Sequence, residues 1–114
     1  MRHRKKLKIG KGIDQKRKLL RSLASSLVLY EKITTSLKNA RAAKSYAEKL
    51  ITRSKENSLH NRRILASMLT PMAAKKAIEV LGPKYKERKG GYTRMIKLVH
   101  HLSGNSKVLL ELVE

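Results

Sequence analysis

Apolar residues recur three or four positions apart through the first 80 residues of the chain, and this spacing predicts helices with one buried face each. The clearest run forms a single face on the first predicted helix: Leu20, Leu23, Ala24, Leu27 and Val28. We expect four helices, which span about 14–30, 36–54, 60–69 and 71–81. The second helix has a narrow stripe of alanines, so another element can pack closely against it.

Capping residues support the predicted helix boundaries. Asp14 is a candidate cap of the first helix, and Thr35 or Ser36 is a candidate cap of the second. Thr70 precedes a proline, which favours the first position of a helix. We expect Gly82-Pro83 to end the fourth helix.

Three short runs are typical of strands. Residues 32–35 include three β-branched residues, Ile33, Thr34 and Thr35, which predict a short strand. The runs 93–102 and 107–113 flank a four-residue loop with a glycine, which predicts an antiparallel hairpin. The order α-β-α-α-α-β-β predicts an α+β fold in two layers, with the helices packed on a small mixed sheet. Residues 1–12 have few apolar positions and are expected to form a basic arm, whereas 13–114 are expected to form a single globular domain.

The net charge of the chain indicates which kind of partner it binds. The 114 residues include 28 Lys or Arg against 8 Asp or Glu, a formal net charge of +20. A small domain on its own tolerates a charge of roughly 2–8, and a larger excess repels itself. The excess indicates a polyanionic partner, because such a partner removes the repulsion. Ten of the first 21 residues are Lys or Arg, so the arm and the start of the first helix are the strongest signal.

The candidate nucleic-acid contacts are basic residues and a glycine pair. Lys and Arg neutralise phosphates and release counterions, and a glycine pair allows the backbone to approach a phosphate. Tyr85 and Tyr92 are expected in the core, with stacking on an unpaired base as the alternative. The candidates are Arg2, His3, Arg4, Lys5, Lys8, Lys11, Lys16, Arg17, Arg21, Lys38, Arg62, Arg63, Lys84, Arg88, Gly90, Gly91 and Arg94.

Other classes of function have little support. There is no cysteine, His100 and His101 would point to opposite faces of a strand, and the scattered acids are more simply partners of nearby basic residues. We therefore expect no enzyme, no metal and no cofactor. The arm has too few bulky apolar anchors for a membrane surface. A free DNA-binding protein, of nucleoid or helix-turn-helix type, is the alternative, but the charge is not focused on one recognition helix, which favours folded RNA.

Several stretches of the chain resemble a known family. They are Met1-Arg2-His3, Glu31-Lys32-Ile33-Thr34-Thr35, Gly82-Pro83-Lys84-Tyr85 and, most specifically, Arg88-Lys89-Gly90-Gly91-Tyr92-Thr93-Arg94. With them the chain resembles the bacterial large-subunit ribosomal protein seventeen family from end to end. It departs from the family at Gln15-Lys16, where a His-Arg pair is usual, and at Leu102-Ser103-Gly104-Asn105, where an Arg-x-Gly-Asp turn is usual.

The resemblance implies a structural constituent of the large ribosomal subunit in the bacterial cytoplasm. It implies binding to large-subunit rRNA near the peptide exit tunnel, with ribosomal proteins twenty-two and thirty-two as neighbours. In that setting the basic residues would neutralise phosphate so that rRNA segments can pack.

Overall fold

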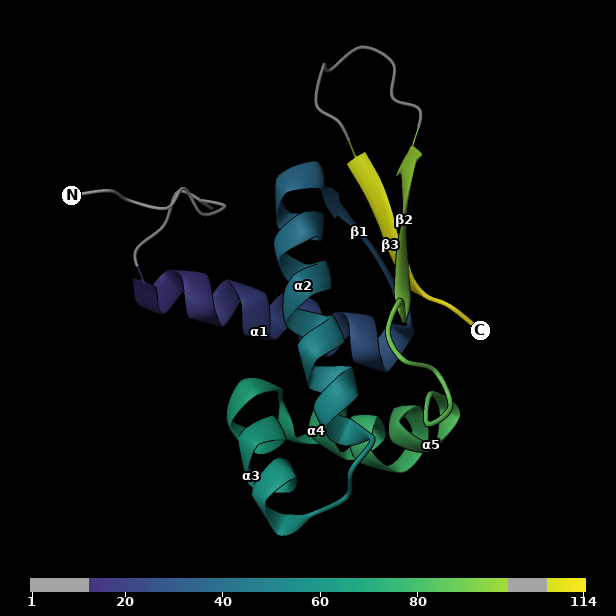
Figure 1. Cartoon of the computed structure of the whole chain (residues 1–114). Helices are drawn as coiled ribbons and strands as arrows, with labels where there is room; N and C mark the ends of the chain where they lie inside the picture. The colour runs from purple at the N-terminus through teal and green to yellow at the C-terminus, as the bar shows by residue number, and fades with distance from the viewer. Residues whose placement is uncertain (1–12, 99–106) are drawn as a thin grey trace, which may run out of the picture.

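Helices pack against one side of a three-stranded sheet in the computed structural model, which describes residues 13–98 and 107–114 (Figure 1). The elements follow in the order α1 (Ile13–Tyr30), β1 (Lys32–Ser36), α2 (Leu37–Ser54), α3 (Leu59–Met68), α4 (Pro71–Lys76), the π-helical turn η1 (Ala77–Leu81), α5 (Gly82–Lys84), β2 (Thr93–Leu98) and β3 (Lys107–Leu112). The predicted α+β fold in two layers is confirmed.

The sheet has the strand order β1-β3-β2, and both pairings are antiparallel. The expectation of a mixed sheet was wrong in this respect, because β3 lies between the other two strands and runs opposite to both. Leu110 of β3 is paired with Ile33 on one side and Met95 on the other. Val108 and Leu110 are fully buried, whereas Glu111 is half-buried on the opposite face, as the alternation predicted. The second part of the strand predicted over 93–102, with His100 and His101, lies outside the described residues.

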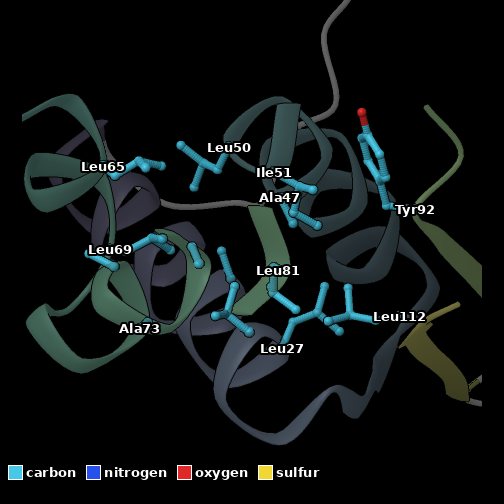
Figure 2. Close-up of a cluster of buried hydrophobic side chains, with 14 of the residues drawn as sticks. Leu27, Ala47, Leu50, Ile51, Leu65, Leu69, Ala73, Leu81, Tyr92 and Leu112 are labelled. Carbon is cyan, nitrogen blue, oxygen red and sulfur yellow. The ribbon is translucent and has the colours of Figure 1, made fainter. Parts of the chain in front are cut away.

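Aliphatic residues and two tyrosines form the core (Figure 2). The chain has no Phe or Trp, and Tyr85 and Tyr92 are the largest of the fully buried side chains, at 2% and 1% exposure. Their ring centroids lie 5.2 Å apart in a tilted arrangement, a favourable geometry for an aromatic pair. The expectation that both tyrosines belong to the core is confirmed. The small side chains of Ala43 and Ala47 on α2 are completely buried, which permits the close packing that the alanine stripe predicted.

Serines cap the two middle helices. Ser36 caps α2, where its Oγ accepts a hydrogen bond from the Asn39 N–H at 3.2 Å. Ser58 caps α3 in the same way, with a 3.1 Å bond from the Asn61 N–H. Asp14 lies inside the first turn of α1, one residue after its start, instead of at the cap. There it still complements the positive end of the helix dipole.

Gly82-Pro83 does not end the fourth helix, contrary to the sequence-based expectation. The helical backbone continues from Pro71 through η1 and α5 to Lys84, and Gly82 has helical angles (φ −55°, ψ −56°). The wide turn η1 is closed by a hydrogen bond from the Gly82 N–H to the Ala77 carbonyl. Pro83 therefore lies in the first turn of a new helical segment, where the missing N–H has no cost.

Candidate nucleic-acid interface

The root of α1 presents three of the predicted contact residues. Figure 1 shows the N-terminal half of α1 extending beyond α2. Arg17 is exposed and Lys16 is half-buried. Arg21 is exposed too, but its guanidinium donates a 3.1 Å hydrogen bond to the carbonyl of Leu69, the residue that ends α3. Arg21 thus holds α1 against the end of α3, in addition to any contact with a partner. The predicted contacts Arg2, His3, Arg4, Lys5, Lys8 and Lys11 lie outside the described residues.

A row of cations follows the solvent face of α2. Lys38, Arg41, Lys49 and Arg53 are all exposed, on the side of the helix away from its buried alanines. Only Lys38 was among the sequence-based candidates. Arg41 lies three residues after Lys38 and Arg53 four residues after Lys49, and these helical intervals are the signal that would have found the others. Arg53 is held in place by its hydrogen bond to the Asn61 side-chain oxygen at 3.2 Å.

Two more arginines stand at the start of α3. Arg62 and Arg63 are exposed, and the Nε of Arg62 donates a 2.7 Å hydrogen bond to the side chain of Asn57. Arg62 also lines a hollow with Lys75 of α4 and Pro83. The same hollow is lined by Glu79, so it combines two cations from different helices with one acid.

The segment 84–92 is held against the core by its two tyrosines. The hydroxyl of Tyr92 accepts hydrogen bonds from Thr52 at 3.2 Å and Lys55 at 2.9 Å, and donates one to the Arg88 carbonyl at 3.4 Å. Burial raises the pKa of Tyr92, but the bonds from Lys55 and Thr52 outweigh this, and the pKa lies below its ordinary value. Lys84 lies over the Tyr85 ring, 5.2 Å from its centroid, and remains exposed.

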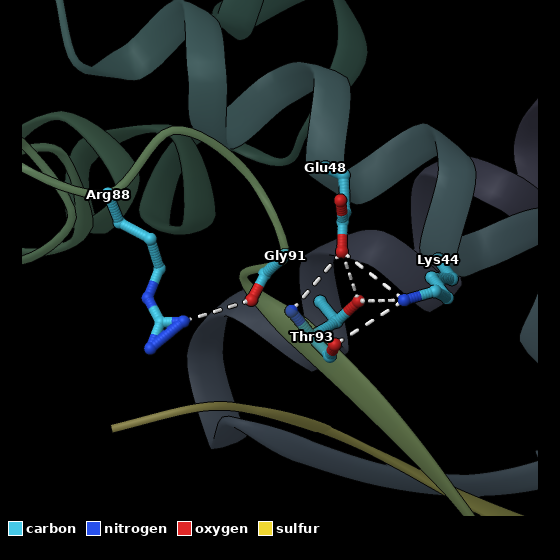
Figure 3. Close-up of polar contacts among 5 residues, drawn as sticks. All are labelled: Lys44, Glu48, Arg88, Gly91 and Thr93. Carbon is cyan, nitrogen blue, oxygen red and sulfur yellow. Dashed lines mark hydrogen bonds and ion pairs between the residues drawn. The ribbon is translucent and has the colours of Figure 1, made fainter.

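Both glycines of the pair have positive φ angles. Gly90 has φ +139° and Gly91 has φ +64°, and a Cβ added at either position would meet nothing within 4 Å. The glycines are therefore required by backbone conformation and leave open space beside the chain. Arg88 is exposed next to them, and its guanidinium donates to the Gly91 carbonyl at 3.4 Å (Figure 3).

A polar cluster fixes the point where this segment enters the sheet. The Glu48 carboxylate on α2 accepts hydrogen bonds from the Thr93 hydroxyl at 2.6 Å and the Thr93 N–H at 3.2 Å (Figure 3). Lys44, one turn earlier on α2, lies 3.4 Å from the same carboxylate oxygen. Burial raises the pKa of Glu48, but the bonds from Thr93 and the charge of Lys44 more than offset it, so the pKa is below its ordinary value. Sequence reasoning treated Glu48 only as the partner of a nearby cation.

Arg94 follows immediately and is paired with Glu111. Its Nε lies 2.5 Å from the Glu111 carboxylate on β3, although its side chain is 59% exposed. The fold thus brings Lys84, Arg88, Gly90, Gly91 and Arg94 into one region between α5 and β2. Lys16, Arg17 and Arg21 on α1, Lys38 on α2, and Arg62 and Arg63 on α3 belong to separate elements.

The described residues of these surfaces suit the binding of anions better than of metal ions or membranes. Within residues 13–98 and 107–114, no group of three or more His, Asp or Glu is placed to hold a metal ion. In the same part of the chain, no helix combines the length and apolar character needed to cross a membrane. Exposed Lys and Arg on several helices and an open glycine backbone are features that suit phosphate groups.

Comparison with known proteins gives consistent matches over nearly the whole chain. A family model described as Ribosomal protein L17 matches residues 19–113. The large ribosomal subunit protein bL17 of Sulfurihydrogenibium sp. is 42% identical over 118 residues, covering 100% of this chain and 98% of that protein. The protein of the same name from Thermoanaerobacter sp. is 42% identical, covering 93% and 96%. That from Endomicrobium trichonymphae is 45% identical, covering 80% and 79%.

Proposed function

Because this chain belongs to the ribosomal protein L17 family, we propose that it binds and stabilises the rRNA of the bacterial large ribosomal subunit. It is a structural large-subunit protein of the cytoplasmic ribosome, not an enzyme. The observation that carries the rRNA proposal is the spread of exposed cations over α1, α2, α3 and the segment 84–94. Cations on several faces fit a protein that is surrounded by folded RNA.

The proposed mechanism is charge neutralisation at several surfaces. The arm, residues 1–12, threads between rRNA helices, while residues 13–114 form the domain that holds it. Lys16, Arg17 and Arg21 contact phosphates at the root of the arm. Three segments provide the other proposed contacts: Lys38, Arg62, Arg63, Lys84, Arg88, Gly90, Gly91 and Arg94. Together these contacts let rRNA segments of like charge pack against one another.

The proposed site on the subunit follows from the resemblance of the Arg88–Arg94 motif and the N-terminal arm to the family. On this basis we place the chain near the mouth of the peptide exit tunnel, beside ribosomal proteins twenty-two and thirty-two. A large net positive charge supports a site rich in rRNA. Crosslinking of assembled large subunits and identification of the linked proteins would test these two neighbours.

A free DNA-binding protein is the competing function. In that class one recognition helix enters the major groove and carries the base contacts. Here the exposed basic residues are instead distributed over three helices and a glycine-containing segment. The geometry therefore favours rRNA.

Sedimentation of a cell lysate on a sucrose gradient tests the proposal. We expect the protein to migrate in stoichiometric amounts with intact large subunits in moderately high salt, and to be released when RNase degrades them. DNase is the matched control and should leave the distribution unchanged. Absence from the subunits together with release by DNase alone would favour the DNA-binding function.

A further inference from the structure

Tyr30 is the one exposed tyrosine among the residues that the structure describes. All four tyrosines lie in the described part of the chain, where Tyr85 and Tyr92 are buried and Tyr46 is half-buried. Tyr30, at the last position of α1, is 71% exposed. A ring at this exposure is free to stack on a partner, and the residues around it decide which kind of partner fits.

Tyr30 stands at one end of a shallow groove along α1. The groove, here called the α1 groove, is lined by residues that include Lys18, Arg21, Ser22, Ser26, Tyr30 and Thr70. Four of them, Lys18, Ser22, Ser26 and Tyr30, follow one another at intervals of four and so form one row on the helix. At 1.5 Å per residue this row is about 18 Å long.

The α1 groove is basic at one end and aromatic at the other. Lys18 and Arg21 are exposed, and none of the described residues that line the groove is acidic. The acid nearest in sequence is Glu31, whose carboxylate lies 3.0 Å from Lys76 and 3.9 Å from Lys84, so its charge is balanced. Asp14 is exposed one turn before Lys18 in the same row, but the charged residues that line the groove itself, Lys18 and Arg21, are both cations and attract an anion.

From this arrangement we propose that the α1 groove binds a short single-stranded segment of rRNA, with one base stacked on Tyr30. The proposal rests on the proposed function. Lys18 and Arg21 contact phosphates of the segment, and the hydroxyls of Ser22 and Ser26 bond to phosphate or ribose oxygens. Unpaired bases stack on aromatic rings, whereas the bases of a duplex are not available to do so.

A protein partner fits the α1 groove less well. The centre of a protein–protein interface is apolar and depleted of charged residues. The α1 groove instead combines two cations with a row of serines, and Tyr30 is its one exposed large apolar side chain. The surface has the composition of a site for single-stranded nucleic acid, in which a basic track is joined to a stacking platform.

The first test measures binding of the full chain to isolated large-subunit rRNA over a range of salt concentrations. We expect Tyr30→Ala to lower the affinity about ten- to a hundred-fold, the range for loss of one base stack. The slope of log affinity against log salt should stay unchanged, because every phosphate contact remains in this variant. Lys18→Gln should instead reduce that slope by about 0.7. Tyr30→Phe, which keeps the ring, should bind like the wild type.

Two controls make the result specific. Met72→Ala removes another large side chain, 74% exposed on α4 and outside the set of groove residues, and should leave the affinity unchanged. Thermal unfolding of Tyr30→Ala should match the wild type, because the side chain is mostly in solvent. Wild-type affinity for Tyr30→Ala would overturn the groove proposal alone, whereas a wild-type chain that does not bind the rRNA would overturn the proposed function.

A second experiment separates RNA from protein at this surface. A photoreactive benzoylphenylalanine is placed at position 30, and the chain is assembled into large subunits and irradiated. Crosslinks to rRNA nucleotides that are unpaired support the proposal. Crosslinks only to another ribosomal protein, or only to base-paired rRNA, would overturn it.

Discussion

Three glycines of this chain have different structural roles, and only their surroundings distinguish these roles. Gly90 and Gly91 are required by positive φ, and open space surrounds them. Gly82 has ordinary helical angles, but a Cβ there would lie only 2.4 Å from the Ser54 carbonyl oxygen. The first two give the backbone a conformation that exposes it, and the third lets α5 approach the end of α2.

Gly82→Ala should therefore destabilise the fold, although alanine favours helices by about 1 kcal/mol over glycine. The clash is with backbone at Ser54, which cannot turn aside as a flexible side chain can. Overpacking of this kind costs about 1–3 kcal/mol. Urea unfolding should show a lower midpoint for this variant. The control is Ala66→Ser on the exposed side of α3, which should change little; a more stable Gly82→Ala would contradict the predicted clash.

The arginines show the same dependence on surroundings. Arg17 and Arg63 are exposed, whereas Arg21 bonds to the Leu69 carbonyl and Arg94 pairs with Glu111. All four are equivalent in the sequence, where each is one cation in a basic stretch. The partners lie 48 residues away for Arg21 and 17 residues away for Arg94. No local pattern reports such distant contacts, so the sequence-based candidates mix structural arginines with free ones.

At the scale of elements, α2 is the support of the proposed interface. One face carries the exposed cations, the buried face carries alanines, and Glu48 with Lys44 binds the start of β2 through Thr93. This cluster fixes the end of the segment that holds Gly90 and Gly91. Glu48 thus positions the segment through Thr93. This role does not require Glu48 to contact a partner.

Glu48→Gln should weaken this support in a pH-dependent way. Hydrogen bonds to a charged group contribute about 1.5–3 kcal/mol, and the variant should lose this order of stability at neutral pH. Because the folded pKa of Glu48 is below its ordinary value of 4.5, its contribution is present above that pH and is lost as the pH falls through the folded pKa. Urea unfolding of wild type and variant at pH 7 and at progressively lower pH should show the difference shrinking.

Thr93→Val provides the matched control for this cluster. It removes the hydroxyl that donates at 2.6 Å but keeps the Thr93 N–H bond to Glu48. In a double-mutant cycle, the effects of Glu48→Gln and Thr93→Val should be less than additive, since they remove one shared interaction. Strict additivity, or a difference that is constant with pH, would contradict the proposed role of the carboxylate.

Most elements were predictable because their signals are local. The apolar spacing of α1 and α2, the cap at Ser36 and the burial of Tyr85 and Tyr92 were all expected from the sequence. Asp14 was misplaced by one or two residues at a helix boundary, whereas the two larger errors concern relations between elements. The Gly82-Pro83 pair usually ends a helix, but here the wide turn η1 and the contact with α2 carry the helical path past it. The strand pairing likewise depends on β3 joining β1, about 75 residues earlier in the chain.

At the scale of the whole molecule, the charge of +20 is divided between the folded elements and the N-terminal arm. The described helices and strands bury one hydrophobic cluster. We therefore expect folding stability and rRNA affinity to separate: the residues in the core determine the first, and the cations on the surface and in the arm determine the second.

Deletion of residues 2–11 tests this separation. The segment contains six Lys or Arg, and each phosphate that is no longer neutralised should reduce the salt slope of rRNA binding by about 0.7, so the slope should fall by up to about 4. The affinity for rRNA should fall together with the salt slope, because the release of counterions is the source of that affinity. Thermal unfolding should remain almost unchanged. A large loss of stability would mean that the arm is part of the core, contrary to the proposed division at residue 12.

Local signals in the chain were enough to establish the helices and strands, the membership of the core and the basic character of the partner-binding surfaces, because periodicity, caps and net charge are properties of neighbouring residues. The three-dimensional packing was needed to establish that Arg21 closes the end of α3, that Glu48 holds the start of β2, and that Tyr30 remains in solvent at the opposite end of the α1 groove from Lys18. These features depend on which segments meet in space. An aromatic ring at a helix end is buried or exposed according to whether another element covers it, and no local pattern contains that information.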